Sequence, residues 1–221
     1  MIIGKVMNRI KLLILMAVAA IIMVGCTKND DTTIVLLGEE EYFNEIIKVI
    51  PSDLINEFDL RFGVQKGNLP PNVEGEYIMS PKKRVYSTLS KTDWPLDIQE
   101  PDVCLKFESQ NNRIAKFKHY EEFVTSVDTI YVMGKDNRFT AYYIEDRMFD
   151  YGIYDVKIKR GIIYCGRVTD DGILDLKYAN IIMDVQDDSH GAIETYPVGT
   201  FFIYEDGSYN GLAERKDWYD E

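Results

Sequence analysis

Beyond residue 72 the chain alternates between apolar and polar positions, which is the pattern of β-strands with one buried face. Val103, Leu105 and Phe107 are separated by Cys104 and Lys106, so one side of this segment is apolar. The other segments of this kind are 73–79, 113–119, 129–133, 139–144, 154–168, 174–185, 199–204 and 209–212. Because no helical pattern stands between them, the sequence predicts a mainly β fold, an antiparallel barrel or sandwich.

Turn signals separate these segments where hairpins are expected. The segments 111–112, 134–137 and 170–172 contain residues that tolerate positive φ angles. Gly161 lies within the segment 154–168 and predicts a kink there. The segment 81–100 shows no clear alternation, and we expect a long polar connection in its place.

The segment 39–62 has a helical period instead. Three glutamates at 39–41 precede apolar residues at helical spacing, among them Phe43, Ile46 and Ile50. Pro51 cannot continue this helix, but it suits the first turn of a new one. We therefore expect two short helices that pack on the β-domain.

The first 25 residues form a segment of another kind. Lys5, Arg9 and Lys11 precede an apolar run from Leu12 to Val24, which is too short to span a bilayer of roughly 30 Å. A glycine and Cys26 follow directly. This order resembles a bacterial lipoprotein signal peptide, in which the cysteine becomes the lipidated first residue of the mature chain.

The residues after Cys26 are similar to an export signal of Bacteroides-type lipoproteins. Lys28, Asp30 and Asp31 supply the lysine and the acids that direct such proteins to the outer face of the outer membrane. The alternative interpretation is a merely solvated tether, with the protein on the periplasm-facing leaflet. Under either interpretation, we expect a protein of the outer membrane that is held there by its lipid.

A second resemblance covers roughly residues 50–212. The segments 51–54 (PSDL) and 71–77 (PNVEGEY) look like Bacteroides-type lipoproteins with a lipocalin-like, or calycin-like, barrel. Gly75-Glu76-Tyr77 stands where lipocalins carry Gly-x-Trp, with tyrosine in place of the tryptophan. The family implies an antiparallel barrel of about 8–10 strands and an envelope location, but no settled activity.

These segments define the predicted organisation of the chain and its charge. The parts are a signal peptide at 1–25, the lipidated cysteine and tether at 26–38, helices at 39–62, the barrel at 72–213 and a polar tail at 214–221. Removing the signal peptide takes away three basic residues, so the formal charge of −12 becomes −15. So acidic a surface repels phosphate backbones, and we expect no nucleic-acid partner.

The sequence offers few groups for catalysis. Once Cys26 is lipidated, Cys104 and Cys165 remain, either as a disulfide or as two separate buried thiols. His119 and His190 are the two histidines of the chain and lie far apart in the sequence. There is no zinc-binding, nucleophile-elbow or phosphate-loop motif. We therefore predict no enzyme, no metal site and no cofactor.

Tyrosines on the predicted strands are the remaining candidates for function. Tyr131, Tyr142, Tyr164 and Tyr178 can line a cavity in a barrel, although tyrosine is also simply a good strand former. We rank first the binding of a small apolar or amphipathic ligand, or of an envelope partner. The alternative is a structural or interaction component of an outer-membrane complex, without a ligand cavity or catalysis.

Overall fold

The computed structural model describes residues 41, 43–89, 95–121, 124–150, 155–186, 191 and 196–216. The chain divides into two units, Met1–Glu40 and Glu41–Glu221, and every described residue lies in the second. The predicted signal peptide and tether therefore lie outside the described residues, and so does most of the predicted polar tail.

Two short helices precede the strands, as the sequence predicts. Residues 43–48 are helical, and helix α3 spans Ile55–Phe62. Gly63 ends α3 in the left-handed conformation, with a φ of 77°. Its N–H donates a hydrogen bond of 2.9 Å to the carbonyl of Asp59, which satisfies one of the last carbonyls of the helix.

Eleven strands form one sheet in the part of the chain that the structure describes. They are β1 Gly75–Met79, β2 Lys82–Ser87, β3 Gln99–Glu100, β4 Val103–Asn111, β5 Ile114–Glu121, β6 Val124–Lys135, β7 Arg138–Asp150, β8 Asp155–Val168, β9 Gly172–Val185, β10 Phe201–Asp206 and β11 Leu212–Arg215. Their order in the sheet is β11-β1-β4-β5-β6-β7-β8-β9-β10-β2-β3, and β11 also pairs with β9.

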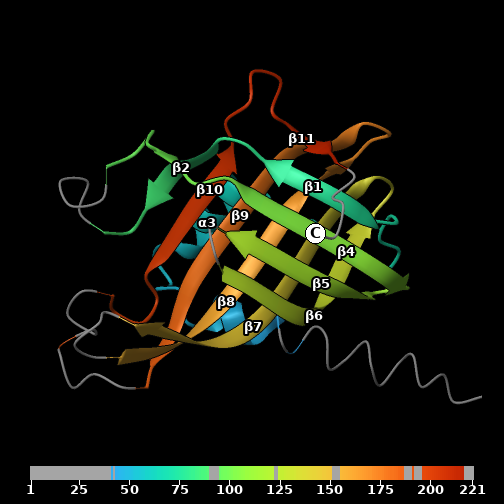
Figure 1. Ribbon diagram of the computed structural model, residues 1–221. Coiled ribbons are helices and arrows are strands. Elements are labelled where there is room, and N and C mark those ends of the chain that lie inside the picture. The colour runs from blue at the N-terminus through green and yellow to red at the C-terminus, as the bar shows by residue number, and fades with distance from the viewer. Residues whose placement is uncertain are drawn as a thin grey trace, which may run out of the picture. The chain divides into compact units, whose positions relative to one another are not determined.

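The sheet closes into a barrel in which eight strand positions form the wall (Figure 1). The strands β4 to β9 occupy one position each, β1 and β2 share another, and β10 and β11 share the last. β1 pairs with β11 and β2 pairs with β10, all antiparallel. β9 pairs with β11 along one part and with β10 along another. The wall thus has eight positions, and the protein is a closed antiparallel barrel, consistent with a lipocalin-like fold. The predicted fold class is confirmed.

The hairpins form where the turn residues predict them. Asn112 between β4 and β5 has a φ of 54°, and Asp136 between β6 and β7 has a φ of 59°. Gly172 at the β8–β9 turn has a φ of 154°, and a Cβ there would lie 2.2 Å from the carbonyl oxygen of Ala213. Only glycine therefore allows β11 to approach β9 this closely.

The segment 81–100 is not the polar connection that the sequence predicts. It contains β2 and β3, and β2 pairs with β10. β2 lacks an apolar alternation because its buried residues are Lys82, Arg84 and Ser87, and the two cations lie over the ring of Tyr204. A strand whose inward residues are charged escapes a search for alternating apolar positions.

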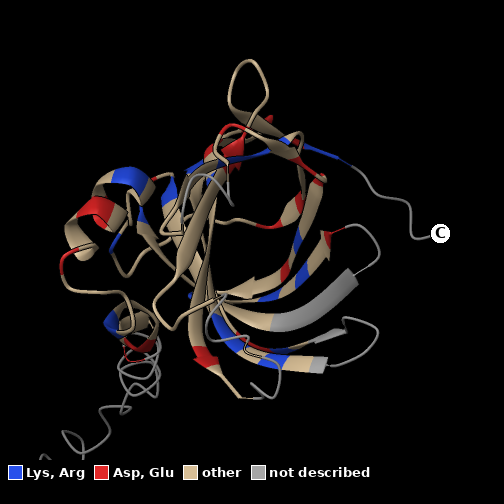
Figure 2. Cartoon of the chain, turned by 90° about the vertical axis from the view of Figure 1, so that its left-hand side faces the viewer, with Lys and Arg blue, Asp and Glu red and all other residues tan. Residues whose placement is uncertain are grey.

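The barrel wall separates two hydrophobic cores. On β8, Tyr164 belongs to the core inside the barrel, whereas Cys165 belongs to the core between the barrel and the helices. Figure 2 shows the helices gathered on one side of the strands. A Cβ at Gly161 would lie 2.5 Å from Cγ2 of Ile46. The glycine therefore allows the helix at 43–48 to pack directly on β8.

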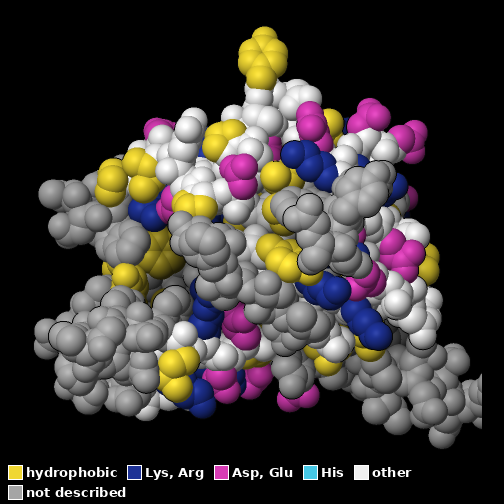
Figure 3. Space-filling model, viewed as in Figure 1, with side chains coloured by type: hydrophobic (Ala, Val, Ile, Leu, Met, Phe, Trp, Pro, Cys, Tyr) yellow, Lys and Arg dark blue, Asp and Glu magenta, His cyan; other side chains and the backbone are white. Residues whose placement is uncertain are grey.

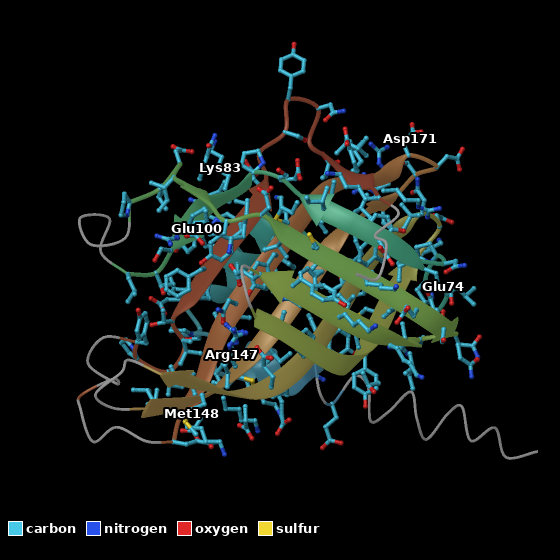
Figure 4. The ribbon with its side chains drawn as sticks, in the orientation of Figure 1. Glu74, Lys83, Glu100, Arg147, Met148 and Asp171 are labelled. Carbon is cyan, nitrogen blue, oxygen red and sulfur yellow. The ribbon has the colours of Figure 1, made fainter. Side chains whose placement is uncertain are left out.

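The two ends of the barrel interior differ in character. At the apolar end, where the β4–β5, β6–β7 and β8–β9 hairpins turn, Phe107 and Phe139 pack with their ring centroids 6.3 Å apart. The opposite end, where β5 ends and β8 begins, is the charged end. Figure 4 shows Glu74 and Asp171 toward the apolar end and Glu100 toward the charged end.

Candidate functional site

A ladder of tyrosines fills the middle of the barrel interior. Neighbouring strands β8, β9 and β10 place Tyr164, Tyr178 and Tyr204 opposite one another in the pairing register. The rings stack with centroid separations of 5.2 Å for both pairs and interplanar angles of 15° and 20°. All three residues are buried. The register of the sheet therefore converts three separated tyrosines into one continuous stack.

His119 on β5 faces this ladder from across the barrel. Its Nδ1 lies 2.8 Å from the hydroxyl of Tyr164, and its ring meets Tyr178 edge-on at 5.8 Å. Its Nε2 lies 3.6 Å from Oε2 of Glu121. A nearby carboxylate favours the tautomer that carries its proton on Nε2, so the Tyr164 hydroxyl donates to Nδ1.

Buried cations form the charged end of the interior. The Lys82 ammonium is 3.2 Å from a carboxylate oxygen of Glu100 and also hydrogen-bonds to Glu121. Arg84 pairs with the other carboxylate oxygen of Glu100. The side chain of Lys82 is 2% exposed, and a buried ammonium is tolerated because two carboxylates surround it. We call Lys82, Arg84, Glu100, His119 and Glu121 the charged network.

A second ion pair stands at the same end of the barrel. Glu145 on β7 and Arg160 on β8 are opposite in the pairing register, and their side chains are joined at 2.5 Å. Asn180 on β9 lies opposite Ile162 and Phe202, both of which belong to the interior core. Its Oδ1 is buried and accepts no hydrogen bond from the described residues.

The charged network shifts the ionisation of its members. Burial raises the pKa of Glu121, but the polar contact with His119 and the charge of Lys82 outweigh it and lower the pKa to about 2. Burial lowers the pKa of His119, and the Glu121 carboxylate does not fully offset this effect. At neutral pH the network therefore contains an ionised glutamate and a neutral histidine.

The environment of the candidate nucleophiles raises their pKa values and so makes them less reactive. Burial raises the pKa of Tyr164 well above its usual value, so its hydroxyl stays protonated beside His119. Burial also raises the pKa of Cys104 to about 11 and that of Cys165 to about 12. Because the thiolate is the nucleophile, both thiols are unreactive at neutral pH. Among the described residues, no three acidic, histidine or cysteine side chains are grouped to hold a metal ion.

The charged network predicts acid sensitivity. Glu121 has a folded-state pKa of about 2 and an ordinary value of 4.5, so its contribution to stability is present above pH 4.5 and is lost as the pH falls toward 2. His119, with its lowered pKa, is charged more readily when unfolded, which also destabilises the fold as the pH falls below about 6.5. We expect Glu121→Gln to reduce the loss of unfolding free energy between pH 6 and 3 by about 2 to 3 kcal/mol.

Urea unfolding at a series of pH values measures this difference. Glu108→Gln is the control, because Glu108 on β4 forms ion pairs with Lys106 and Lys118, and all three side chains are partly exposed. Parallel pH profiles for wild type and Glu121→Gln would show that the network does not couple to folding.

The four tyrosines predicted to line a cavity divide into two pairs. Tyr131 and Tyr142 belong to the core under the helices, where their rings lie 5.8 Å apart, and the prediction is wrong for them. Strand alternation turns both outward, and the helices cover that face. Tyr164 and Tyr178 face the interior, but each is at most 2% exposed. They pack on one another and on His119.

The cysteines are free thiols, so the disulfide alternative is wrong. The Cys165 thiol lies under α3 and donates to the carbonyl of Phe62 at 3.0 Å. Cys104 lies on β4, four wall positions away from β8. Four of eight positions place β4 and β8 on opposite sides of the barrel, and both cysteines face outward, because Val103 and Leu105 beside Cys104 belong to the interior core and Cys165 to the core under the helices. The two thiols therefore point away from each other and cannot form a disulfide.

The predicted lipidation and export residues lie outside the described part of the chain. These are Cys26, Lys28, Asp30 and Asp31, and His190 is outside it as well. None of the described helices is long and apolar enough to cross a membrane.

Sequence reasoning missed the cations of the charged network. Lys82 and Arg84 stand two positions apart, on the same face of a strand, and Glu100 follows at the next strand. Alternating cations followed by a glutamate are the pattern that could have revealed them. It was obscured because charged residues usually mark a solvated surface.

Comparison with protein-family models, curated protein sequences and solved structures finds no match to this chain. The architecture alone therefore defines its class, a closed antiparallel barrel consistent with a lipocalin-like fold. One fold of this kind hosts many functions, so the function must be argued from the residues of the barrel.

Proposed function

We propose that this chain is a lipid-anchored protein of the bacterial outer membrane whose barrel is a non-catalytic interaction module. The observation that carries the proposal is the close packing of the described side chains in the middle of the interior. Phe117, Tyr164 and Tyr178 are each at most 2% exposed, and they contact one another or His119 across the barrel. An eight-stranded barrel has room either for such side chains or for one small ligand. Recognition then takes place on the outer surface.

The proposed location depends on the N-terminal residues. Cys26 would carry the lipid, and Lys28, Asp30 and Asp31 would direct the protein to the cell surface, with the periplasm-facing leaflet as the alternative. The acidic mature chain is repelled by anionic head groups, so the lipid must supply the attachment.

We propose that the barrel is not catalytic because of the chemistry of its interior side chains. Catalysis by a nucleophile requires a lowered pKa or an adjacent base that can take its proton. Tyr164 has such a neighbour in His119, but burial raises the pKa of the hydroxyl, and both residues are shielded inside the barrel. Tyr164 and His119 therefore suit a structural role, in which their hydrogen bond orients both side chains within the core.

A small amphipathic ligand at the charged end is the second candidate function. It is favoured by two buried polar atoms: Oδ1 of Asn180, which has no hydrogen-bond partner among the described residues, and Nε2 of His119, which lies 3.6 Å from Glu121, beyond hydrogen-bond distance. Such atoms cost roughly 1–3 kcal/mol each unless water or a ligand satisfies them. One ordered water at each atom would suffice, and the interaction role therefore ranks first.

Cross-linking in intact cells tests the proposed function. The full chain, with a C-terminal affinity tag, is cross-linked on cells that process lipoproteins, and the products are identified by mass spectrometry. We expect a protein partner in stoichiometric amount. The Cys26→Ala variant should no longer be found in the membrane fraction and should not cross-link to this partner. The Cys104→Ala variant should remain in the membrane fraction and keep the partner.

The opposite outcome is equally definite. If the membrane-bound wild type yields no stoichiometric protein partner, and instead copurifies with one small molecule, the interaction role is wrong and the second candidate replaces it.

A further inference from the structure

Asn210 and Gly211 form the one Asn-Gly pair of the chain, and it lies in the loop between β10 and β11. Figure 1 shows this loop projecting from the barrel, and Figure 3 shows a hydrophobic side chain standing clear of the surface there. Asn210 is exposed, and its neighbour Tyr209 has a relative accessibility of 108%. Water and solvent bases therefore reach the side chain of Asn210.

The carboxamide of Asn210 is oriented by two hydrogen bonds from its own loop. Its Oδ1 accepts from the Ser208 hydroxyl at 3.1 Å and from the N–H of Leu212 at 3.3 Å. Because a backbone N–H can only donate, the atom that faces Leu212 is the oxygen of the carboxamide. Both donors stabilise the negative charge that develops on this oxygen when a nucleophile attacks Cγ.

Gly211 places a nucleophile next to that carbon. Attack of its backbone nitrogen on Cγ of Asn210 closes a five-membered ring, and the two groups are held together by the chain itself. A Cβ at Gly211 would have Oδ1 of Asp175, at 3.9 Å, as its nearest neighbour, so the site is uncrowded. The N–H of Gly211 donates to the carbonyl of Ser208 at 3.1 Å, and this bond must open before attack.

We propose that Asn210 is a site of spontaneous deamidation, in which the backbone nitrogen of Gly211 displaces the side-chain amide. The nitrogen loses its proton to a solvent base and bonds to Cγ. The bond between Cγ and Nδ2 breaks, and Nδ2 leaves as ammonia with a proton from water. A second water molecule then adds to one carbonyl of the cyclic imide and reopens the ring. The sum consumes water and releases ammonia, and no group is oxidised or reduced.

The two products differ in how they connect the chain. Opening the ring at Cγ gives aspartate, whose carboxylate can still accept from Ser208 and Leu212. Opening it at the main-chain carbonyl gives isoaspartate, in which the main chain passes through Cγ and is one atom longer. This lengthened segment directly precedes the residues that join the loop to β9.

The join to β9 begins one residue after the modified position. The carbonyl of Gly211 accepts from the N–H of Asp175 at 2.9 Å, and β11 then pairs with β9 from Leu212 onward. We expect isoaspartate to displace this carbonyl and to loosen the start of β11. Because the reaction needs only the loop and water, it takes place whatever the barrel binds.

Ageing of the purified full chain in mildly alkaline heavy-oxygen water tests the site. Peptide mapping by mass spectrometry should show that Asn210 loses ammonia and gains one solvent oxygen, as a mixture of aspartate and isoaspartate. Asn112 and Asn137, which are exposed turn residues followed by arginine, are internal controls and should stay unmodified over the same period. Asn210→Gln should also stay unmodified, because its attack must close a larger ring.

A parallel sample in urea shows the reaction of the unfolded chain. If Asn210 reacts in urea but stays intact in the folded protein, the loop protects the residue and the proposed site is wrong. Equal modification of all three asparagines in the folded protein would likewise overturn it.

Amide hydrogen exchange tests the effect on the wall. The Asp175 N–H should exchange about fivefold faster or more in the isoaspartate fraction than in the fresh chain, equivalent to the loss of one hydrogen bond. Asn210→Asp, which adds the same charge without lengthening the chain, should keep the slow exchange. The N–H of Ile182, which donates to Thr200 at 2.9 Å further along β9, should not change. Equal exchange at Asp175 in all three samples would overturn the loosening of β11.

Discussion

Replacing Lys82 with alanine is expected to lower the free energy of unfolding by about 3 to 5 kcal/mol. The ammonium is buried between Glu100 and Glu121, and its removal leaves the Glu121 carboxylate without its cation, whereas Glu100 keeps Arg84. Both carboxylates are largely shielded from bulk water, because their side chains are 15% and 26% exposed. Urea unfolding followed by circular dichroism measures the loss.

The neighbouring residue provides a matched control. Lys83 points to the outside of β2 and pairs with Asp97, at 3.0 Å, with side-chain exposures of 34% and 77%. Exposed pairs of this kind contribute little to stability because water screens them, so Lys83→Ala should have a much smaller effect than Lys82→Ala. Equal losses for Lys82→Ala and Lys83→Ala would show that the charged network does not stabilise the barrel.

Replacing Tyr178 with alanine is expected to cost about 3 to 5 kcal/mol as well, for a different reason. Tyr178 is the middle ring of the ladder and contacts Tyr164, Tyr204 and His119. Its removal opens a cavity in the centre of the barrel that surrounding strands cannot close. Thermal unfolding measures the loss, and Tyr209→Ala, which removes a fully exposed ring, should change stability by less than about 0.5 kcal/mol.

Most of the fold could be predicted because its strands obey a simple rule. Val103, Leu105 and Phe107 face the interior of the barrel, and the predicted alternation identifies all three. The turn at 170–172 and the break at Pro51 were equally readable, since their residues restrict the backbone locally. β2 was missed because its inward residues are cations, and their favourable environment depends on distant strands.

The roles of the tyrosines could not be predicted from alternation alone. Tyr142 and Tyr143 are both buried, although they point to opposite sides of β7, because the helices cover the outer face there. A sequence pattern shows that two neighbours face opposite ways, but it does not show which face is inside. That assignment depends on closure of the barrel and on where the helices pack.

The charged network was hidden for a related reason. Tyr164 and His119 are separated by 45 positions in the sequence, and Lys82 and Glu121 by 39. Each pair is brought together only because the barrel wall closes on itself. The local sequence around each residue does not show this closure.

The filled interior is tested most directly by the thermal midpoint of the wild-type protein beside that of Tyr178→Ala. Both are screened against indole and against lipids, bile acids, haem and glycans. The structure predicts that none of these ligands shifts the wild-type midpoint, whereas indole raises that of Tyr178→Ala by occupying the vacated ring position. A saturable rise for the wild type, equivalent to roughly 2.7 kcal/mol at a hundredfold excess of ligand over its dissociation constant, would contradict a filled barrel.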